Sequence, residues 1–578
     1  MPTVHLASKS YVHMIRLLSI GIGFCFLFCC GQPRIGAGAR VTGIIGEQAM
    51  VVSAHTEASK VGSEIMRKGG NAWDAAVAVQ FALAVVHPVA GNIGGGGFAV
   101  YRENDGSIGS LDFREKAPLN AHRDMYLDER GDVIDRLSLE GHLAAGVPGS
   151  VDGMIRLHNR FGALPWKALV QPSVDLARNG FTLAQEGAAL LNREQHLFKK
   201  LNTYNLEFVK AGEWHSGEIV IQEDLAKTLE RIRDEGRDGF YNGKTADLII
   251  AEMQRGGGAI SAKDLAIYVS SWRDPVVGNY KSHRIISMPP PSSGGIALIQ
   301  LLKGVAPFNL DNYEHNSAKA LHLMTEVEKL VYADRATYLG DPDFVDVPQE
   351  MLLSDDYIIE RMASIDPRKT TPSSKIKEGM VDIIESVETT HFSVVDPFGN
   401  AVAITTTLNS YFGCKVMVKG AGFFLNNEMD DFSVKVGVPN QFGLVGAKAN
   451  EIAAEKRMLS SMTPTIVEKD NDLLMVVGSP GGSTIITSVF QTILNVIDYN
   501  MGMQQAVNAK RLHHQWLPDR ILVEPAAISA KTMKHLQKLG HKFESRDAIG
   551  RVDAILVLPD AKLEGGADPR GEDRAVGF

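Results

Sequence analysis

The 578-residue chain is long enough for several cores or one large one, and its 44% hydrophobic and 22% charged residues are typical of a globular protein. A net charge of −9 argues against a nucleic-acid-binding protein, because that function needs a clustered basic face. No stretch after residue 35 is apolar for long enough to span a bilayer.

The N-terminus has the pattern of an export signal. Lys9 and Arg16 precede an apolar run over residues 17–30. This run is short for a transmembrane helix and typical of a signal peptide. We therefore predict that residues 1–30 direct export to the periplasm or the cell exterior, with an uncleaved anchor as the alternative. The run also resembles a lipoprotein signal, in which Cys30 would carry lipid and hold the protein on a membrane surface.

Helices and strands then alternate along the chain. Helical patterns cover Glu57–Lys68 and Ala72–Val86, followed by a glycine-rich turn at Asn92–Gly97 and a strand at Phe98–Arg102. The middle, from Leu143 to Met380, alternates amphipathic helical patterns with short loops. Strands near both ends with helices between them favour a layered α+β domain.

A β-hairpin is predicted over residues 389–407. Both flanks are rich in β-branched and aromatic residues, and Pro397 and Gly399 suit a three-residue loop with a bulge. That loop pairs Asp396 with Asn400.

This register places Thr389 directly across from Thr407, close enough for their hydroxyls to interact. Asn409 follows on the same face if the strand continues. A threonine hydroxyl becomes a useful nucleophile when its residue begins the chain, because its own α-amine can act as the base. Taken alone, the pair is also explained by ordinary packing in a hairpin.

A second glycine-rich turn joins the apolar run Leu473–Val477 to a helical pattern from Thr484 to about Tyr499. Backbone N–H groups of the turn, at Gly481 and Gly482, would point outward at the positive end of the helix dipole. Such a turn forms an anion site or an oxyanion hole, although a plain strand-to-helix connection remains the alternative.

Three other patterns do not indicate a site on their own. Residues 239–245 lack the glycine spacing of a phosphate-binding loop, and His513 and His514 lack the spacing of a helical zinc pair. Asp430 and Asp431 fit either a carboxylate pair or a turn.

In order and spacing, these motifs resemble the gamma-glutamyltransferase family of N-terminal-nucleophile hydrolases over roughly residues 45–578. The matching segments are Leu111–Glu115, Thr389–Val394, Thr407–Asn409, Leu425–Phe432, Leu459–Met462, Gly478–Gly482 and Arg511–Trp516. The resemblance implies an α+β fold, the four-layer αββα sandwich of that superfamily.

The resemblance also implies that the precursor cleaves itself between Glu388 and Thr389. Residues 31–388 would become a large subunit and residues 389–578 a small catalytic one, and both would form one globular heterodimer. Thr389 would then form a gamma-glutamyl-enzyme ester, which water or an amino-acid or peptide acceptor resolves. The implied donor is a gamma-glutamyl compound such as glutathione, and no metal or organic cofactor is implied.

The family's site residues map onto this chain position by position. Thr407 would orient the nucleophile, and the oxyanion hole would be formed by Gly481 and Gly482. The substrate α-carboxylate would be bound by Arg114, Ser460 and Ser461. The substrate α-ammonium would be bound by Asp431, with Glu428 and Asn409 beside it.

Two positions depart from the family pattern. Phe442 stands in a lid loop where relatives often have a tyrosine, so the hydroxyl that would latch to Asn409 is missing and we expect a looser gate. Glu428 replaces the glutamine of some bacterial relatives and adds an acidic group near the ammonium site. The alternatives are a glutaryl- or cephalosporin-type acylase on the same fold, disfavoured by Asp431, and a non-enzymatic amino-acid-binding surface lipoprotein.

Overall fold

Two seven-stranded β-sheets form the centre of the computed structural model, which describes residues 41–376, 389–435, 438, 441 and 448–578. The first sheet contains, in order, β1 (Ile44–Gly46), β18 (Leu563–Gly566), β17 (Asp553–Val557), β13 (Asp472–Gly478), β12 (Thr465–Lys469), β9 (His283–Ser287) and β8 (Val276–Tyr280). The second sheet contains β19 (Arg574–Gly577), β2 (Met50–Ser53), β10 (Thr390–Val395), β11 (Ala401–Thr407), β3 (Gly96–Arg102), β4 (Ile108–Asp112) and β7 (Ser271–Arg273).

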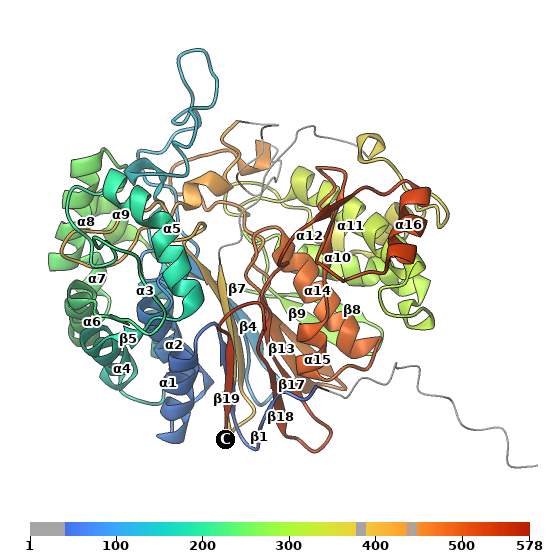
Figure 1. Ribbon diagram of the computed structural model, residues 1–578, viewed down its shortest axis with the longest axis horizontal. Coiled ribbons are helices and arrows are strands. Elements are labelled where there is room, and N and C mark those ends of the chain that lie inside the picture. Colours follow the sequence, from blue (N-terminus) through green and yellow to red (C-terminus); the bar gives the residue numbers. More distant parts are fainter. Residues whose placement is uncertain (1–40, 377–388, 436–437, 439–440, 442–447) are drawn as a thin grey trace, which may run out of the picture. The chain divides into compact units, whose positions relative to one another are not determined.

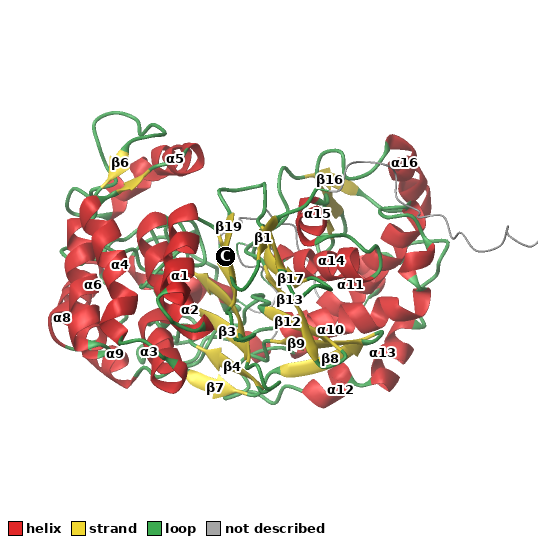
Figure 2. Cartoon of the chain, turned by 90° about the horizontal axis from the view of Figure 1, so that it is seen from below, coloured by secondary structure: helices red, strands yellow, loops and turns green. Residues whose placement is uncertain are grey.

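A helical layer covers the outer face of each sheet (Figures 1 and 2). The second sheet is covered by α1 (Thr56–Arg67), α2 (Ala72–Val86), α3 (Ser150–Phe161), α4 (Trp166–Asn179), α5 (Gln185–Leu201), α6 (Glu223–Glu235), α7 (Asp238–Tyr241), α8 (Gly243–Gly256) and α9 (Ala262–Ile267). The first sheet is covered by α10 (Gly294–Val305), α11 (Ala318–Tyr338), α12 (Gln349–Leu353), α13 (Asp355–Met362), α14 (Thr484–Ile497), α15 (Met503–Asn508) and α16 (Ala530–Leu539). Two small sheets contain β5 (Phe181–Thr182) with β6 (Ile219–Val220), and β14 (Leu512–His513) with β15 (Ile521–Val523) and β16 (Phe543–Ser545).

The side chains of β11 show why the sheets stack. Ala401 and Ala403 pack in the core between the two sheets, whereas Val402 and Ile404 pack in the core beneath the helices. Because successive side chains of a strand point to opposite faces, a strand buried on both faces must be apolar at consecutive positions. The predicted four-layer αββα sandwich is therefore confirmed.

The hairpin has the predicted register. Thr390 pairs with Thr406 and Val395 with Ala401, and Gly399 has the left-handed φ of 88° that the loop requires. The carboxylate of Asp396 also accepts a hydrogen bond from the Ala72 amide at 2.9 Å, which ties the turn to the start of α2. The hairpin lies inside the second sheet, because β10 also pairs with β2 and β11 with β3.

Two expectations about local structure were wrong. The strands β7, β8 and β9 lie within the stretch that we expected to be helical, and two of them form sheet edges, where short half-buried segments give weak signals. The strand also ends at Thr407, and Asn409 takes a left-handed φ of 72° instead of continuing it.

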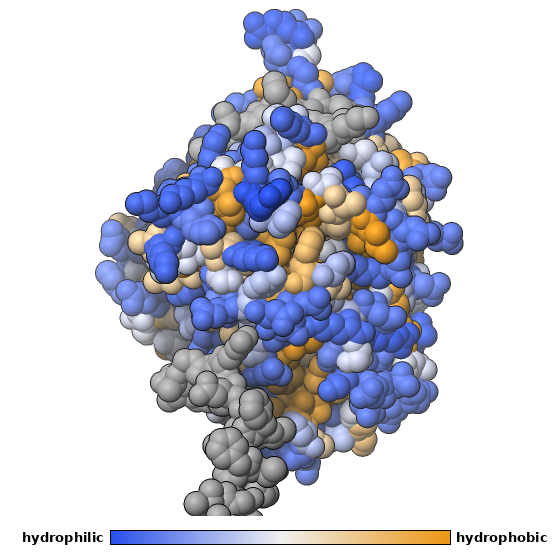
Figure 3. Space-filling model, turned by 90° about the vertical axis from the view of Figure 1, so that its right-hand side faces the viewer, coloured by the Kyte–Doolittle hydropathy of each residue, from blue (hydrophilic) through white to orange (hydrophobic). Residues whose placement is uncertain are grey.

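The outer surface of the α10–α16 side is largely hydrophilic, with small hydrophobic groups between polar side chains (Figure 3). Among the residues that the structure describes, no helix is both long and apolar enough to cross a membrane.

A glycine in the first sheet makes room for a buried histidine of the second. A Cβ at Gly478 would lie 2.2 Å from His391 Cε1. The imidazole is fixed by Thr405 Oγ at 2.8 Å and Ser393 Oγ at 3.1 Å, and Ser393 in turn donates to the Asp553 carbonyl across the two sheets.

We predict that Gly478→Ala lowers stability by about 1–3 kcal/mol, because the added methyl group overpacks the sheet interface. Thermal unfolding would measure the loss, and adding His391→Ala should recover part of it. Gly212→Ala is the control, since a Cβ there meets nothing within 4 Å. Additive effects of the two substitutions would contradict the steric account.

Candidate active site

Thr389 lies between two hollows. The inner pocket, of about 510 Å³, is lined by Arg114, Arg335, Thr389, Thr407, Asn409, Glu428, Asp431, Phe432, Ser433, Asn450, Leu459, Ser460, Ser461, Met462, Gly482 and Ile485. The outer cleft, of about 2080 Å³, also reaches Thr389 and is lined on its far sides by α5 and by residues 546–551. A residue that lines both the pocket and the cleft can contact a ligand that extends into both.

The inner pocket brings together residues that are far apart in the sequence. Every predicted catalytic and substrate-binding residue within the described part of the chain lines it, except Gly481, which adjoins Gly482. Glu388 and Phe442, the predicted cleavage and lid positions, lie outside the described residues.

The hairpin end and the segment after it place two of these residues. Thr407 is buried, and its Oγ accepts a hydrogen bond from the Asn409 amide at 2.7 Å. The Thr407 hydroxyl also makes a hydrogen bond with the Glu428 carboxyl, which links it to the charged end of the pocket. Asn409 is held by its own side chain, which donates to the Asn427 carbonyl at 3.0 Å.

One arginine and three acids form the charged end of the pocket. Arg114 Nη2 lies 2.5 Å from Asp431 Oδ2, and Arg114 Nη1 lies 2.8 Å from Glu428 Oε2 and 3.7 Å from Glu115 Oε2. The carboxylate of the neighbouring Asp430 instead accepts a hydrogen bond from Ser138 Oγ at 2.7 Å, which ties the two segments together. The aspartate that contacts Arg114 is therefore Asp431, the residue expected to bind the substrate ammonium.

Burial governs the protonation of these acids. It raises the pKa of Glu428 well above its usual range and that of Glu115 to about 8, although the Arg114 charge opposes both shifts. Burial also raises the pKa of Asp431, again against Arg114. Near neutral pH the cluster therefore holds fewer negative charges than carboxyl groups.

The glycine-rich turn lies where β13 ends and α14 begins. Gly481 and Gly482 have φ values of 138° and 55°, which glycine adopts without strain. The Gly481 carbonyl accepts from the Thr484 amide at 3.0 Å, so the turn leads directly into the first turn of α14. The positive end of the helix dipole thus adjoins the inner pocket at Gly482.

Sequence reasoning missed several lining residues. Asn450 bridges two walls of the pocket, because its side chain donates to the Asp431 carbonyl at 2.7 Å and accepts from the Leu459 amide at 3.0 Å. Arg335 reaches the pocket from α11 and donates to Ser461 Oγ at 3.1 Å. No local pattern marked either residue, since their roles arise from contacts with distant segments. Glu115 did have a signal, its position beside Arg114 in a matched motif.

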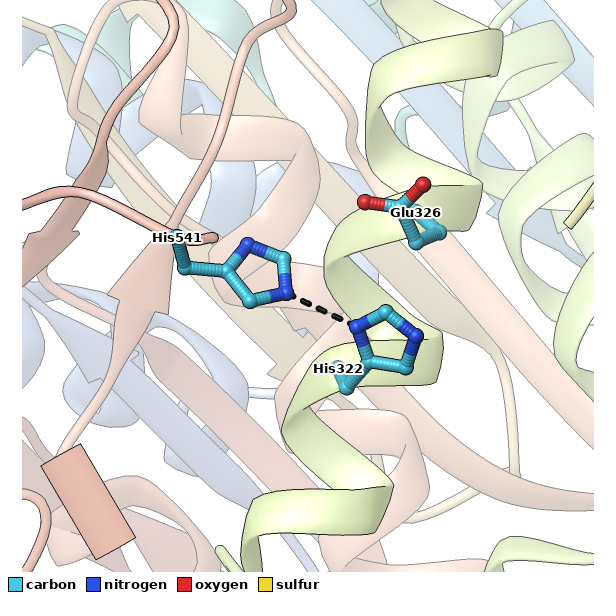
Figure 4. Close-up of side chains that lie close together, drawn as sticks. All are labelled: His322, Glu326 and His541. Carbon is cyan, nitrogen blue, oxygen red and sulfur yellow. Dashed lines mark hydrogen bonds between the residues drawn. The ribbon is translucent and has the colours of Figure 1, made fainter. Parts of the chain in front are cut away.

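A second cluster of titratable side chains contains His322, Glu326 and His541 (Figure 4). His322 and Glu326 lie near the start of α11, and His541 lies just after α16. The two imidazoles are hydrogen-bonded to each other at 2.8 Å. Glu326 accepts from Lys329 Nζ at 2.9 Å and from a backbone N–H of residues 366–371 at 2.8 Å. These groups satisfy one another and fasten residues 366–371 to α11, which indicates a structural role.

Comparisons with known proteins agree with this geometry. A family model described as gamma-glutamyltranspeptidase matches residues 58–578. The chain is 46% identical over 581 residues to a glutathione hydrolase proenzyme of Escherichia coli strain K12, with 98% of each chain covered. Among solved structures, it is similar to a cephalosporin acylase of Bacillus halodurans, with a TM-score of 0.80, 25% identity, and 95% of this chain and 99% of that chain covered. A gamma-glutamyltranspeptidase of Helicobacter pylori gives a TM-score of 0.56 at 43% identity, covering 61% of this chain and 99% of that chain.

The raised pKa of Glu115 predicts a pH-dependent stability. Folding raises this pKa from 4.5 to about 8, so the stabilisation is complete below 4.5 and is lost as the pH rises through about 8. Glu115→Gln keeps a neutral side chain at every pH. Thermal unfolding should therefore show a smaller loss of stability between pH 6 and 9 in Glu115→Gln than in the wild type.

Glu350→Gln, at an exposed position of α12, is the matched control and should follow the wild type. Parallel pH profiles for the wild type and Glu115→Gln would show that Glu115 does not take up a proton on folding.

Proposed function

The chain belongs to the gamma-glutamyltranspeptidase family, and we propose that it is a self-processing gamma-glutamyltransferase and glutathione hydrolase. The observation on which the proposal depends is the position of Thr389. It lies at the head of a central hairpin and lines a pocket in which Arg114 contacts buried acids.

Self-cleavage is the first step of the proposed reaction. The Thr389 hydroxyl attacks the Glu388 carbonyl, the peptide bond is replaced by an ester, and water releases residues 31–388 from residues 389–578. The proenzyme name of the Escherichia coli relative supports this step, as does the solved Helicobacter pylori chain that matches only 61% of this one. Because β10 and β11 lie between β2 and β3, the two products remain one folded unit.

The new α-amine of Thr389 then serves as the base for its own hydroxyl. The hydroxyl attacks the γ-carbonyl of the donor, and the amine passes its proton to the leaving amino group. Amides of Gly481 and Gly482 stabilise the oxyanion, a contribution for which losing one donor typically costs about 100- to 1,000-fold in rate. Thr407, which lines the same pocket, orients the nucleophile.

The charged end of the inner pocket matches a gamma-glutamyl group. Its α-carboxylate binds Arg114, Ser460 and Ser461, and its α-ammonium binds Asp431 and Glu428. Arg114 pairs with those same two acids, so the donor exchanges contacts within the protein for contacts of Arg114 with its carboxylate and of the acids with its ammonium. A glutaryl group has no ammonium to offer and would leave the acids without a cation, which disfavours the acylase alternative.

The outer cleft accommodates the part of the donor beyond the scissile bond and, later, the acceptor. Its volume of about 2080 Å³ and its contact with Thr389 suit peptides and amino acids of varied size. Three predictions concern residues outside the described part of the chain. They are export by residues 1–30, lipid on Cys30 and a gate at Phe442.

Thr389→Ala is expected to abolish both self-cleavage and turnover, because no hydroxyl remains to attack either carbonyl. Mass spectrometry of the wild type should find a fragment that begins at Thr389, and a chromogenic gamma-glutamyl anilide should be hydrolysed. Thr389→Ser, which keeps a hydroxyl, is the matched control and should cleave. An intact, active wild-type chain would contradict the mechanism.

Glu428 predicts proton release on ligand binding. Burial keeps its carboxyl group protonated in the empty pocket, and an incoming ammonium favours the charged form. Calorimetric titration with L-glutamate near pH 7.5, in buffers of different protonation enthalpy, should show release of up to about one proton. Glu428→Gln should remove that release, and equal release from both proteins would assign the proton to another group.

A further inference from the structure

Arg335 is a buried cation that lines the inner pocket. It lies on α11 and is only 4% exposed, yet its guanidinium faces the same space as Thr389 and Asp431. Among the residues that the structure describes, it forms no ion pair, whereas Arg114 has carboxylate oxygens at 2.5 and 2.8 Å. A buried arginine without a carboxylate is costly unless a ligand supplies the anion.

Two serine hydroxyls hold Arg335 in place. Nε donates to Ser293 Oγ at 2.9 Å, and Nη2 donates to Ser461 Oγ at 3.1 Å. Ser293 Oγ in turn donates a hydrogen bond to the Ser460 carbonyl at 2.6 Å. This bond fixes the loop that contains both pocket serines. One of the two hydroxyls that hold the guanidinium, that of Ser461, therefore belongs to the segment predicted to bind the substrate carboxylate.

The direction of these bonds orients the hydroxyl of Ser461. An arginine can only donate, so the Ser461 oxygen must accept from Arg335. Its proton is then available to an acceptor on its other side, where the inner pocket lies. A carboxylate placed there would receive a hydroxyl proton that is polarised by a positive charge one bond further away.

The charge of Arg335 persists at neutral pH. Burial lowers its pKa to about 10, and Asp431 acts in the opposite direction. Asp431 is paired with Arg114 at 2.5 Å, so Arg335 is the arginine of the pocket that has no carboxylate partner among the described residues. The pocket is thus prepared for one more anionic group than its own acids provide.

We propose that Arg335 is a positioning residue for the α-carboxylate of the donor, which it attracts through its charge and through the hydroxyl of Ser461. The inference rests on the proposed function, because it takes a gamma-glutamyl group as the ligand. Arg114 then acts as the direct partner of the carboxylate, and Arg335 adds a second positive charge on the side of Ser461.

The test compares two anilide substrates, gamma-glutamyl and 4-aminobutanoyl, which differ only in the α-carboxylate. The wild type should prefer the gamma-glutamyl anilide in kcat/KM. Arg335→Gln should reduce that preference by about 10- to 100-fold, chiefly through a higher KM for the gamma-glutamyl anilide, the expected effect of one charge-assisted contact. Equal losses for both substrates would overturn the proposal, because they would mean a purely structural role.

Arg361→Gln is the matched control. Arg361 lies on α13 and pairs with Asp334 of α11 at 2.9 Å. Neither residue lines the inner pocket, so the loss of Arg361 should leave the substrate preference unchanged. Arg335→Lys keeps the charge but cannot hold both serines, and it should give an intermediate preference even where Arg335→Gln fails to fold. An unchanged preference in Arg335→Lys and Ser461→Ala would also overturn the proposal. A wild type that hydrolyses neither anilide would instead refute the proposed function.

Discussion

The pairing of β10 with β11 is the constraint on which the site depends. Thr390 opposite Thr406 sets the register, and that register brings Thr389 to the end of the hairpin beside Thr407. A slip of one residue would turn every side chain of the strand to the other face, exchanging the core between the sheets with the core beneath the helices. Three features protect the hairpin against such a slip. They are its bulged turn, the hydrogen bond from the Ala72 amide at the start of α2 to the Asp396 carboxylate, and a neighbouring strand on each side.

Electrostatics of the inner pocket follow from the same burial. Three carboxyl groups and two arginines converge in a buried region. Burial therefore favours the protonated forms of Glu115 and Glu428, while Arg335 keeps its charge near neutral pH. Arg114 is satisfied internally, and only a ligand with both an anion and a cation can replace its partners without leaving a buried charge alone. A ligand that replaces only one partner of Arg114 leaves a buried charge unpaired. The proposed selectivity of the pocket thus depends on that cost as much as on the attraction between the ligand and the charged side chains.

Local features of the sequence predicted the parts of the fold that are locally determined. The limits of α2 and the register of the hairpin depend on caps, turn residues and alternation, all of which lie within a few residues of each other. By contrast, Arg335 meets Ser461 only because α11 packs beside a loop 126 residues further along the chain. No spacing within α11 distinguishes that arginine from one that faces solvent. The edge strand β8 was missed for a related reason, since its stability comes from β9 beside it.

Under the proposed self-cleavage, breaking one bond would activate the protein without rebuilding it. In the single chain, Arg114, Thr407, Asp431 and Gly482 already surround Thr389 in the inner pocket. Strands from both sides of the cleavage position interleave in the second sheet, so scission leaves the core pairings unchanged. What changes is the backbone nitrogen of Thr389. Before cleavage it is an amide nitrogen, which cannot accept a proton, and after cleavage it is an amine, which can. Activation is then a change in the chemistry of one nitrogen atom within a preformed pocket.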